Sequence, residues 1–162
     1  MSQINYRQII KTFSAELPRF ADGRIDYTES DTAPVLICFV KYEKKLLLLQ
    51  RSDKVKTYHG RWNTVAGYID EDKPLLEKAK EELFEELGLD LELIINAKEG
   101  KPYQFTDDNI KITWIIFPIL VELKTKPEIE LDWEHTQYRW VNPERLPDYN
   151  TIPNLIKSYN SF

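Results

Sequence analysis

Residues Gly67–Leu89 read GYIDEDKPLLEKAKEELFEELGL, and this stretch decides the fold. Its second half predicts an amphipathic helix, because apolar residues recur at a spacing of four and form one stripe: Leu75, Ala79, Leu83 and Leu87. Asp72 is the predicted N-cap, and Pro74 suits the first turn of a helix. Gly88 is a typical residue at a helix C-terminus. The stretch therefore predicts a loop followed by a helix with one buried face.

Three glutamates of this helix, Glu82, Glu85 and Glu86, fall within roughly 100° of arc on one face. Like charges at these spacings repel each other and destabilise a helix. The cluster therefore either lowers helix stability or holds a cation. Carboxylate oxygens that converge from one rigid face suit Mg²⁺ or Mn²⁺. An ordinary acidic surface is the alternative interpretation.

The charge of the chain is unevenly distributed. Asp70–Glu86 holds eight acidic residues and three lysines, whereas Lys41–Arg61 holds seven lysines and arginines and two acidic residues. A cationic segment that leads into an anionic one suits a site for a polyanion and a divalent cation. Two oppositely charged surfaces without a shared role are the alternative. The pI of about 5.2, without a basic stripe among aromatics, argues against polymeric nucleic acid as a partner.

Length and composition indicate one globular domain, because the chain has 162 residues of which 42% are hydrophobic. The single cysteine, Cys38, lies in an apolar run and is expected to be a buried free thiol in a reducing compartment. No apolar run approaches the ~20 residues of a membrane-spanning helix. The first residues lack the apolar segment of a secretion signal. We therefore expect a cytoplasmic protein with no membrane partner.

The remaining pattern alternates strands and helices and predicts an α/β protein, a mixed sheet flanked by helices. An amphipathic helix is expected over residues 4–17 and a loop or small hairpin over 18–33. Residues 34–42 and 45–51 are expected to pair as a hairpin. Further strands are expected over 62–68, 91–99, 102–106, 110–123 and 136–141, and a closing helix over 152–160.

The Gly67–Leu89 stretch closely resembles the Nudix box, whose pattern is G-x5-E-x7-R-E-U-x-E-E-x-G-U with U an aliphatic residue. The matching positions are Gly67, Glu82, Leu83, Glu85, Glu86, Gly88 and Leu89. Upstream GRWNTVAG and downstream EHTQYRWVNPERL also resemble the family, so the likeness covers about residues 34–146. It implies a Nudix-type α/β/α sandwich with a mixed β-sheet.

The resemblance also suggests how the chain is organised. We expect one Nudix domain over residues 1–162. Residues 1–33 would form an N-terminal extension packed on the domain, residues 34–146 its core, and residues 147–162 a C-terminal helix.

Two positions depart from the Nudix box. Lys73 stands where the pattern has its first Glu, and Glu81 stands where it has Arg. In the family these two side chains are taken to pair and to brace the loop against the helix. We expect Lys73 and Glu81 to form the same brace with reversed polarity. Lysine does not bind a carboxylate bidentately as arginine does, so this brace is expected to be weaker.

The resemblance implies a pyrophosphohydrolase that attacks a nucleoside diphosphate linked to another moiety, with water as the nucleophile at phosphorus. It implies Mg²⁺ or Mn²⁺ held by Glu82, Glu85 and Glu86 and by the backbone carbonyl of Ala66. The general base is either one of the box glutamates, Glu85 foremost, or Glu134, which precedes the last strand. The neighbouring His135 is expected on the surface.

The expected partner is a small phosphate-containing molecule, a nucleotide derivative. Arg51 is the first choice for a contact with its phosphates, followed by Lys54, Lys56 and Arg61. Tyr68 is a candidate for stacking on a base, although aromatic side chains here also suit the core. The oligomeric state stays open at this point, with a homodimer as one alternative because many relatives are homodimers.

Two alternatives to hydrolysis stay open. KLLLLQRSDKVKTYHGRWNT, residues 45–64, resembles isopentenyl-diphosphate isomerase, which shares the Nudix fold. That enzyme uses a cysteine shortly after this segment, where this chain has NTVAGY, and Cys38 is a poor substitute. The Lys73 and Glu81 departures also allow an inactive Nudix-fold nucleotide-binding module.

Overall fold

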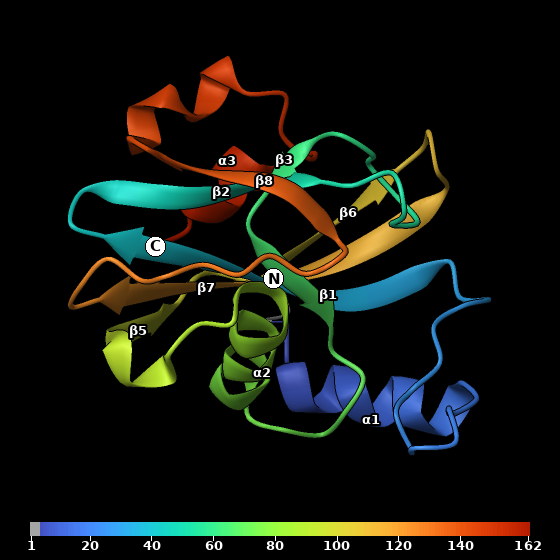
Figure 1. Ribbon diagram of the computed structural model, residues 1–162. Coiled ribbons are helices and arrows are strands. Elements are labelled where there is room, and N and C mark those ends of the chain that lie inside the picture. The colour runs from blue at the N-terminus through green and yellow to red at the C-terminus, as the bar shows by residue number, and fades with distance from the viewer. Residues whose placement is uncertain (1–3) are drawn as a thin grey trace.

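The computed structural model describes residues 4–162, and its centre is one mixed eight-stranded sheet (Figure 1). Five strands follow the order β3-β2-β1-β7-β5, while β4 pairs with β1, β6 with β7 and β8 with β2. The strands are β1 (Thr32–Tyr42), β2 (Lys45–Arg51), β3 (Trp62–Asn63), β4 (Val65–Tyr68), β5 (Ile94–Glu99), β6 (Tyr103–Asp107), β7 (Ile112–Leu123) and β8 (His135–Val141). The expected α/β class with a mixed sheet is confirmed.

Strands β1 and β7 form the middle of the sheet. They pair in parallel along their length, from Thr32 opposite Thr113 to Tyr42 opposite Leu123. Helices and loops cover both faces here, so successive residues of β1 such as Ile37, Cys38 and Phe39 are all buried. This explains why the segment reads as a continuous apolar run and does not alternate.

The predicted hairpin of β1 and β2 forms only at its turn, where Lys41 lies opposite Leu46 and Tyr42 opposite Lys45. Beyond that point β2 pairs with β3 and β8, and β1 pairs with β4. The strand predicted over 62–68 is therefore two strands, separated at Thr64, whose hydroxyl donates to the Cys38 carbonyl (2.6 Å). This separation of β2 from β1 opens the sheet at the position of the pocket described below.

Helices cover both sides of the sheet (Figure 1). Helices α1 (Tyr6–Glu16) and α2 (Leu75–Leu87) lie on one side, and the 3₁₀ segment η2 (Pro143–Asp148) and helix α3 (Leu155–Tyr159) lie on the other. The apolar stripe of α2 is buried as predicted. The closing helix expected over 152–160 forms as the shorter α3, and the other residues of the segment 147–162 are not α-helical.

Two element boundaries differ from the sequence prediction. Pro74, not Asp72, is the N-cap of α2; its backbone is extended (ψ 137°) and no side chain caps the first turn. The strand predicted from residue 91 begins only at Ile94. A 3₁₀ turn, η1 (Leu91–Leu93), precedes it, because the Asp90 carboxylate accepts a hydrogen bond from the Glu92 N–H. Gly88 ends α2 as predicted, with a left-handed φ of 60°.

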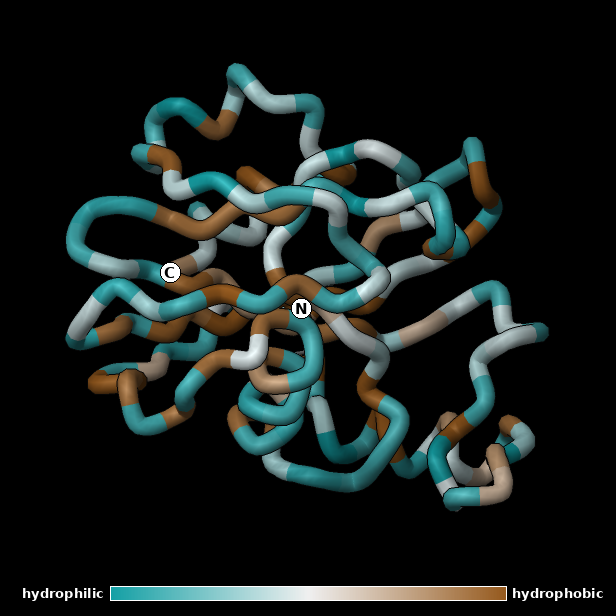
Figure 2. The backbone as a smooth tube through the Cα atoms, viewed as in Figure 1, coloured by the Kyte–Doolittle hydropathy of each residue, from teal (hydrophilic) through white to brown (hydrophobic). Residues whose placement is uncertain are grey.

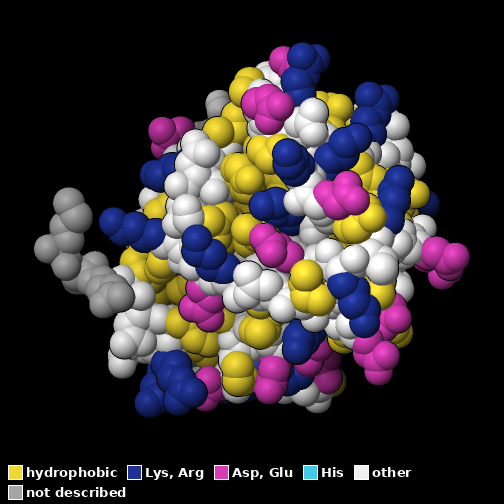
Figure 3. Space-filling model, turned by 90° about the vertical axis from the view of Figure 1, so that its left-hand side faces the viewer, with side chains coloured by type: hydrophobic (Ala, Val, Ile, Leu, Met, Phe, Trp, Pro, Cys, Tyr) yellow, Lys and Arg dark blue, Asp and Glu magenta, His cyan; other side chains and the backbone are white. Residues whose placement is uncertain are grey.

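The hydrophobic residues follow the central strands, whereas the outer loops are hydrophilic (Figure 2). Cys38 is fully buried and is a free thiol, as expected. On the side shown in Figure 3, basic and acidic side chains are interspersed with hydrophobic ones. Within residues 4–162 no helix is long and apolar enough to cross a lipid bilayer.

Candidate active site

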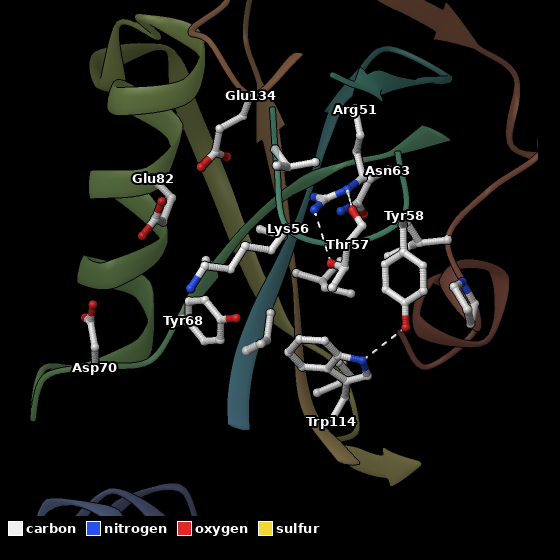
Figure 4. A pocket seen from close by; sticks show the side chains of 18 of the residues that line it. Arg51, Lys56, Thr57, Tyr58, Asn63, Tyr68, Asp70, Glu82, Trp114 and Glu134 are labelled. Carbon is white, nitrogen blue, oxygen red and sulfur yellow. Dashed lines mark hydrogen bonds between the residues drawn. The ribbon is translucent and has the colours of Figure 1, made fainter. Parts of the chain in front are cut away.

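A pocket of about 360 Å³ lies between α2 and the sheet. Its helix side carries acidic groups, among them Glu82, and its opposite side carries Tyr58 and Trp114 (Figure 4). Arg51 and Lys56 lie between these two sides. One end of the pocket can therefore bind cations, the middle can bind anions, and the far end offers aromatic surface.

Glu82 is held against the backbone of β4. A Cβ atom at Gly67 would overlap the Glu82 carboxylate, so only glycine permits this close approach. Ala66, the residue before Gly67, lines the same pocket. Glu86, one turn further along α2, is 2% exposed, whereas Glu85 is exposed at the pocket edge. The three box glutamates thus share a helix face but differ strongly in burial.

Glu134 reaches this face through the loop before β8. The loop is tied to neighbouring backbone by hydrogen bonds from Glu130 N–H to the Leu87 carbonyl (2.9 Å), from Asp132 N–H to the Glu86 carbonyl (3.2 Å), and from Ser52 N–H to the Glu134 carbonyl (2.7 Å). As a result, one ligand atom from each of Glu86, Glu134 and His135 lies within 4.8 Å of the others. The structure therefore brings Glu134 next to the helix glutamates.

His135 is buried, with 6% of its surface exposed, and the expectation of a surface histidine is wrong. Its Nδ1 atom lies 3.4 Å from Asp132 Oδ1 and 4.0 Å from Glu86 Oε2. Burial, with Arg51 nearby, lowers the pKa of His135 to about 4, so the imidazole is neutral at pH 7. One weak signal in the sequence pointed to a role for His135 in the site, namely its position next to Glu134.

Within residues 4–162 the carboxylates of this cluster have a single lysine contact, from Lys78 Nζ to Glu82 Oε1 (3.8 Å). Burial raises the pKa of Glu82 to about 8, with Glu85 and Glu134 adding to the shift and Lys78 opposing it. Burial and the neighbouring Glu134 and Glu82 raise the pKa of Glu86 well above its ordinary value. Glu86 Oε2 and His135 Nδ1 are buried without a hydrogen-bond partner within residues 4–162.

These features fit a divalent cation. Oxygen donors of Glu86 and Glu134 lie within 4.8 Å of each other in a mostly buried group, and Glu82 lines the pocket together with Glu134. An ion there would satisfy the unpaired Glu86 oxygen and offset the carboxylate repulsion that raises the pKa values. The neutral His135 adds one possible nitrogen ligand.

The cationic candidates separate into two groups. Arg51 lines the pocket and is fixed by a hydrogen bond from Nε to the Thr57 carbonyl (2.9 Å), and Lys56 also lines the pocket. Lys54 is exposed and does not line it. Arg61 also lies outside the pocket lining, with its guanidinium 5.9 Å from the Tyr58 ring centroid.

Aromatic side chains line the other end of the pocket. Tyr68 lies 6.3 Å from Trp114 between ring centroids. Trp114 Nε1 donates to the Tyr58 hydroxyl (3.1 Å), which donates to Asp107 Oδ2 (2.8 Å). These bonds fix two rings at the pocket wall. Sequence analysis did not single out Trp114, because a tryptophan in an apolar strand normally indicates core.

The predicted Lys73–Glu81 pair forms, with Lys73 Nζ 2.5 Å from Glu81 Oε1. A second lysine, which the sequence prediction missed, joins it. Lys78 is 5% exposed, and its Nζ lies 2.9 Å from Asp70 Oδ1 and 3.8 Å from Glu82 Oε1. The loop before α2 is therefore braced by two lysines.

Comparison with known proteins places these features in a family. The sequence model of the NUDIX domain matches residues 31–160. An RNA pyrophosphohydrolase from Bartonella henselae is 32% identical over an alignment of 132 residues, and the match covers 72% of this chain and 72% of that protein. The nucleoside triphosphatase NudI of Escherichia coli O139:H28 is 26% identical over an alignment of 125 residues, and the match covers 71% of this chain and 86% of that protein.

Solved structures of Nudix hydrolases share the fold of this chain. A MutT NUDIX hydrolase from Burkholderia pseudomallei superposes with a TM-score of 0.67 at 18% identity, covering 80% of this chain and 97% of that one. The match over residues 31–160 includes α2 with its three glutamates and the loop that carries Glu134. Domain match, fold and glutamate pattern agree, and the chain belongs to the Nudix hydrolase family.

Proposed function

We propose that this protein hydrolyses the phosphoric anhydride bond of a nucleotide derivative, a nucleoside diphosphate linked to another moiety, with Mg²⁺ or Mn²⁺ as cofactor. The observation that carries the proposal is the division of one pocket into three parts. Carboxylates, the cationic side chains Arg51 and Lys56, and a set of aromatic rings lie along it. A divalent cation, a phosphate chain and a base need these three environments.

The carboxylates account for the reaction type. A bound divalent ion neutralises phosphate charge and lowers the pKa of water. Glu82 and Glu86 are the foremost candidates to hold it, with Glu134, His135 and the Ala66 carbonyl in the same region. The water proton passes to a carboxylate when the oxygen attacks phosphorus and the anhydride P–O bond breaks. Glu85 and Glu134 are the two candidates for that general base.

The cationic and aromatic groups account for the substrate. Arg51 is held in place by Thr57 and can offer its remaining guanidinium N–H groups to a phosphate, and the longer Lys56 can follow the phosphate chain. Tyr68 and Trp114 offer ring faces to a base. A volume of about 360 Å³ falls in the range of small-molecule sites, roughly 300–1,000 Å³.

The alternatives have less support. Cys38 is buried in β1 and does not line the pocket, which argues against a cysteine-dependent isomerase. The intact carboxylate cluster argues against an inactive module, because a module that only binds nucleotide has no need of it. A homodimer and a cytoplasmic location stay predictions.

The test is release of phosphate, pyrophosphate or nucleoside monophosphate from nucleoside triphosphates, nucleotide sugars and dinucleotides, with Mg²⁺ or Mn²⁺ and with EDTA. Glu86→Gln is the inactive control, and Glu77→Gln on the exposed side of α2 is its match. Metal-dependent turnover that only Glu86→Gln abolishes supports the proposal. A folded protein that binds nucleotide without turnover supports the binding module, and allylic product from isopentenyl diphosphate supports the isomerase.

A further inference from the structure

The N-terminal segment, residues 4–30, precedes the NUDIX match and packs against the loop that follows β4. This loop, residues 69–73, joins the pocket wall to α2. Three donors of the N-terminal segment bind its carbonyl groups: Tyr6 Oη to Lys73 (2.7 Å), Ile25 N–H to Asp70 (2.9 Å) and Tyr27 Oη to Ile69 (2.6 Å). The segment is thus fixed to the backbone beside the site.

Tyr27 makes a second contact that reaches the pocket itself. Its ring stacks on the ring of Tyr68, with centroids 5.5 Å apart and an interplanar angle of 17°. Tyr27 is 7% exposed and does not line the pocket, whereas Tyr68 is 40% exposed and does. Tyr27 therefore lies behind Tyr68, on the side away from the ligand space.

The stack limits where the Tyr68 ring can lie. Trp114 is its neighbour along the pocket wall, at 6.3 Å between centroids. The Tyr27 hydroxyl is anchored to the Ile69 carbonyl, the residue directly after Tyr68, so Tyr27 fixes both the ring and the adjacent backbone. A ring that is already ordered loses less freedom when a ligand stacks on it.

We propose that Tyr27 is a positioning residue that holds Tyr68 for stacking on the base of the substrate, so that the N-terminal segment is part of the substrate pocket. The inference rests on the proposed function, because it requires a substrate with an aromatic base. Tyr27 touches neither phosphates nor carboxylates of the cluster. Its loss should weaken binding of the base and leave the chemical step unchanged.

The experiment compares the variants Tyr27→Leu, Tyr27→Phe and Tyr6→Leu with the wild-type protein. Tyr27→Leu removes the stack, and Tyr27→Phe keeps the ring. Tyr6→Leu removes another aromatic ring and hydroxyl of the same segment, one that packs against Phe117 and not against Tyr68. Steady-state kinetics with a nucleoside triphosphate give KM and kcat, and inorganic tripolyphosphate serves as a competitive inhibitor that carries phosphates but no base.

We expect Tyr27→Leu to raise KM for the nucleotide about 3- to 10-fold, the range of one aromatic pair, with kcat unchanged. The inhibition constant of tripolyphosphate should not change. Tyr27→Phe should restore KM to within about twofold of the wild type, since it keeps the aromatic pair, and Tyr6→Leu should leave KM unaltered. In a mutant cycle, Tyr68→Leu should raise KM, and adding Tyr27→Leu should raise it no further.

An unchanged KM in active Tyr27→Leu overturns the inference and leaves the proposed function standing. The inference is also overturned if Tyr27→Leu weakens the binding of nucleotide and of tripolyphosphate equally, or if Tyr6→Leu raises KM as much as Tyr27→Leu does. Each of these results indicates a general loss of structure. Absence of nucleotide turnover in the wild type overturns the proposed function and this inference together. Melting temperatures identify unfolded variants, and Tyr27→Met, which keeps apolar volume, replaces Tyr27→Leu if that variant does not fold.

Discussion

Two acidic clusters on α2 and its surroundings differ in how their charge is balanced. The brace cluster consists of Asp70, Glu71 and Glu81 with the lysines Lys73 and Lys78, whose Nζ atoms lie 2.5–3.6 Å from those carboxylates. The ligand cluster consists of Glu82, Glu85, Glu86 and Glu134 with His135. Within residues 4–162 it has a single lysine contact, from Lys78 to Glu82 at 3.8 Å.

The difference shows that acidic residues on one helix can be assigned to different roles by whether the chain supplies a cation beside them. In the brace cluster each carboxylate has a cation within the chain, so the cluster is complete and its role is structural. In the ligand cluster burial raises the pKa of Glu82 to about 8 and that of Glu86 well above the ordinary range, so the carboxylates resist ionisation without a further cation. A bound cation would supply the positive charge that these carboxylates need in order to ionise.

Of the substitutions that test the difference between the two clusters, Glu86→Gln should have the largest effect, and this effect is on activity. It removes a charged ligand from the buried site, and we expect activity to fall by about 100- to 10,000-fold. The metal-free protein should be at least as stable as the wild type, because a buried unpaired carboxylate is removed. Metal-dependent turnover and melting temperature check both parts; a fully active variant would place the ligand cluster outside the reaction.

Lys78→Met should destabilise the brace cluster. Lys78 is 5% exposed, and its removal leaves Asp70 without its 2.9 Å partner, so we expect a loss of about 2–4 kcal/mol in the free energy of unfolding. Lys80→Met on the same helix is the control and should change stability by less than about 0.5 kcal/mol. Urea unfolding of both variants measures this, and equal losses would contradict the distinction between the lysines.

Stabilisation by Mg²⁺ should rise with pH. Without an ion, the folded protein has a Glu82 pKa of about 8 against an ordinary value of 4.5, so it binds more protons than the unfolded chain between these values. Its stability therefore falls as pH rises through that window. A cation replaces the proton, and the gain in melting temperature on adding Mg²⁺ should be larger at about pH 9 than at about pH 6. A gain that is independent of pH would contradict proton–metal competition.

Reversing the Lys73–Glu81 pair should have the smallest effect. Lys73→Glu places a third carboxylate beside Glu71 and Glu81, and Glu81→Arg places a third cation beside Lys73 and Lys78, so each single change should lower the melting temperature slightly. The double variant should recover most of the loss, because Arg binds a carboxylate bidentately. A double variant no more stable than the weaker single variant would show that the pair does not brace the loop.

Sequence analysis predicted the elements whose signal is local. The helix stripe of α2 and its left-handed end at Gly88 lie within one short stretch, where spacing fixes the relative positions. The Lys73–Glu81 pair was predicted from the resemblance to the Nudix box, and it forms. The predicted N-cap at Asp72 is wrong, because α2 begins at Leu75 and Pro74 is its N-cap. Lys54 and Arg61 do not line the pocket, whereas Lys56 of the same loop does, and no periodic pattern predicts which side chains of a loop turn inward.

By itself, then, the sequence determined the glutamate face of α2, the buried strands of the sheet and the resemblance to the Nudix box. Only the tertiary structure decided which other groups meet that face. Glu134 and His135 arrive through backbone hydrogen bonds to the end of α2, Lys78 turns inward to Asp70, and Tyr27 reaches Tyr68 from the N-terminal segment. The reason is physical: helical and strand periodicity act over a few residues, whereas these contacts depend on how loops far apart in sequence pack on one sheet.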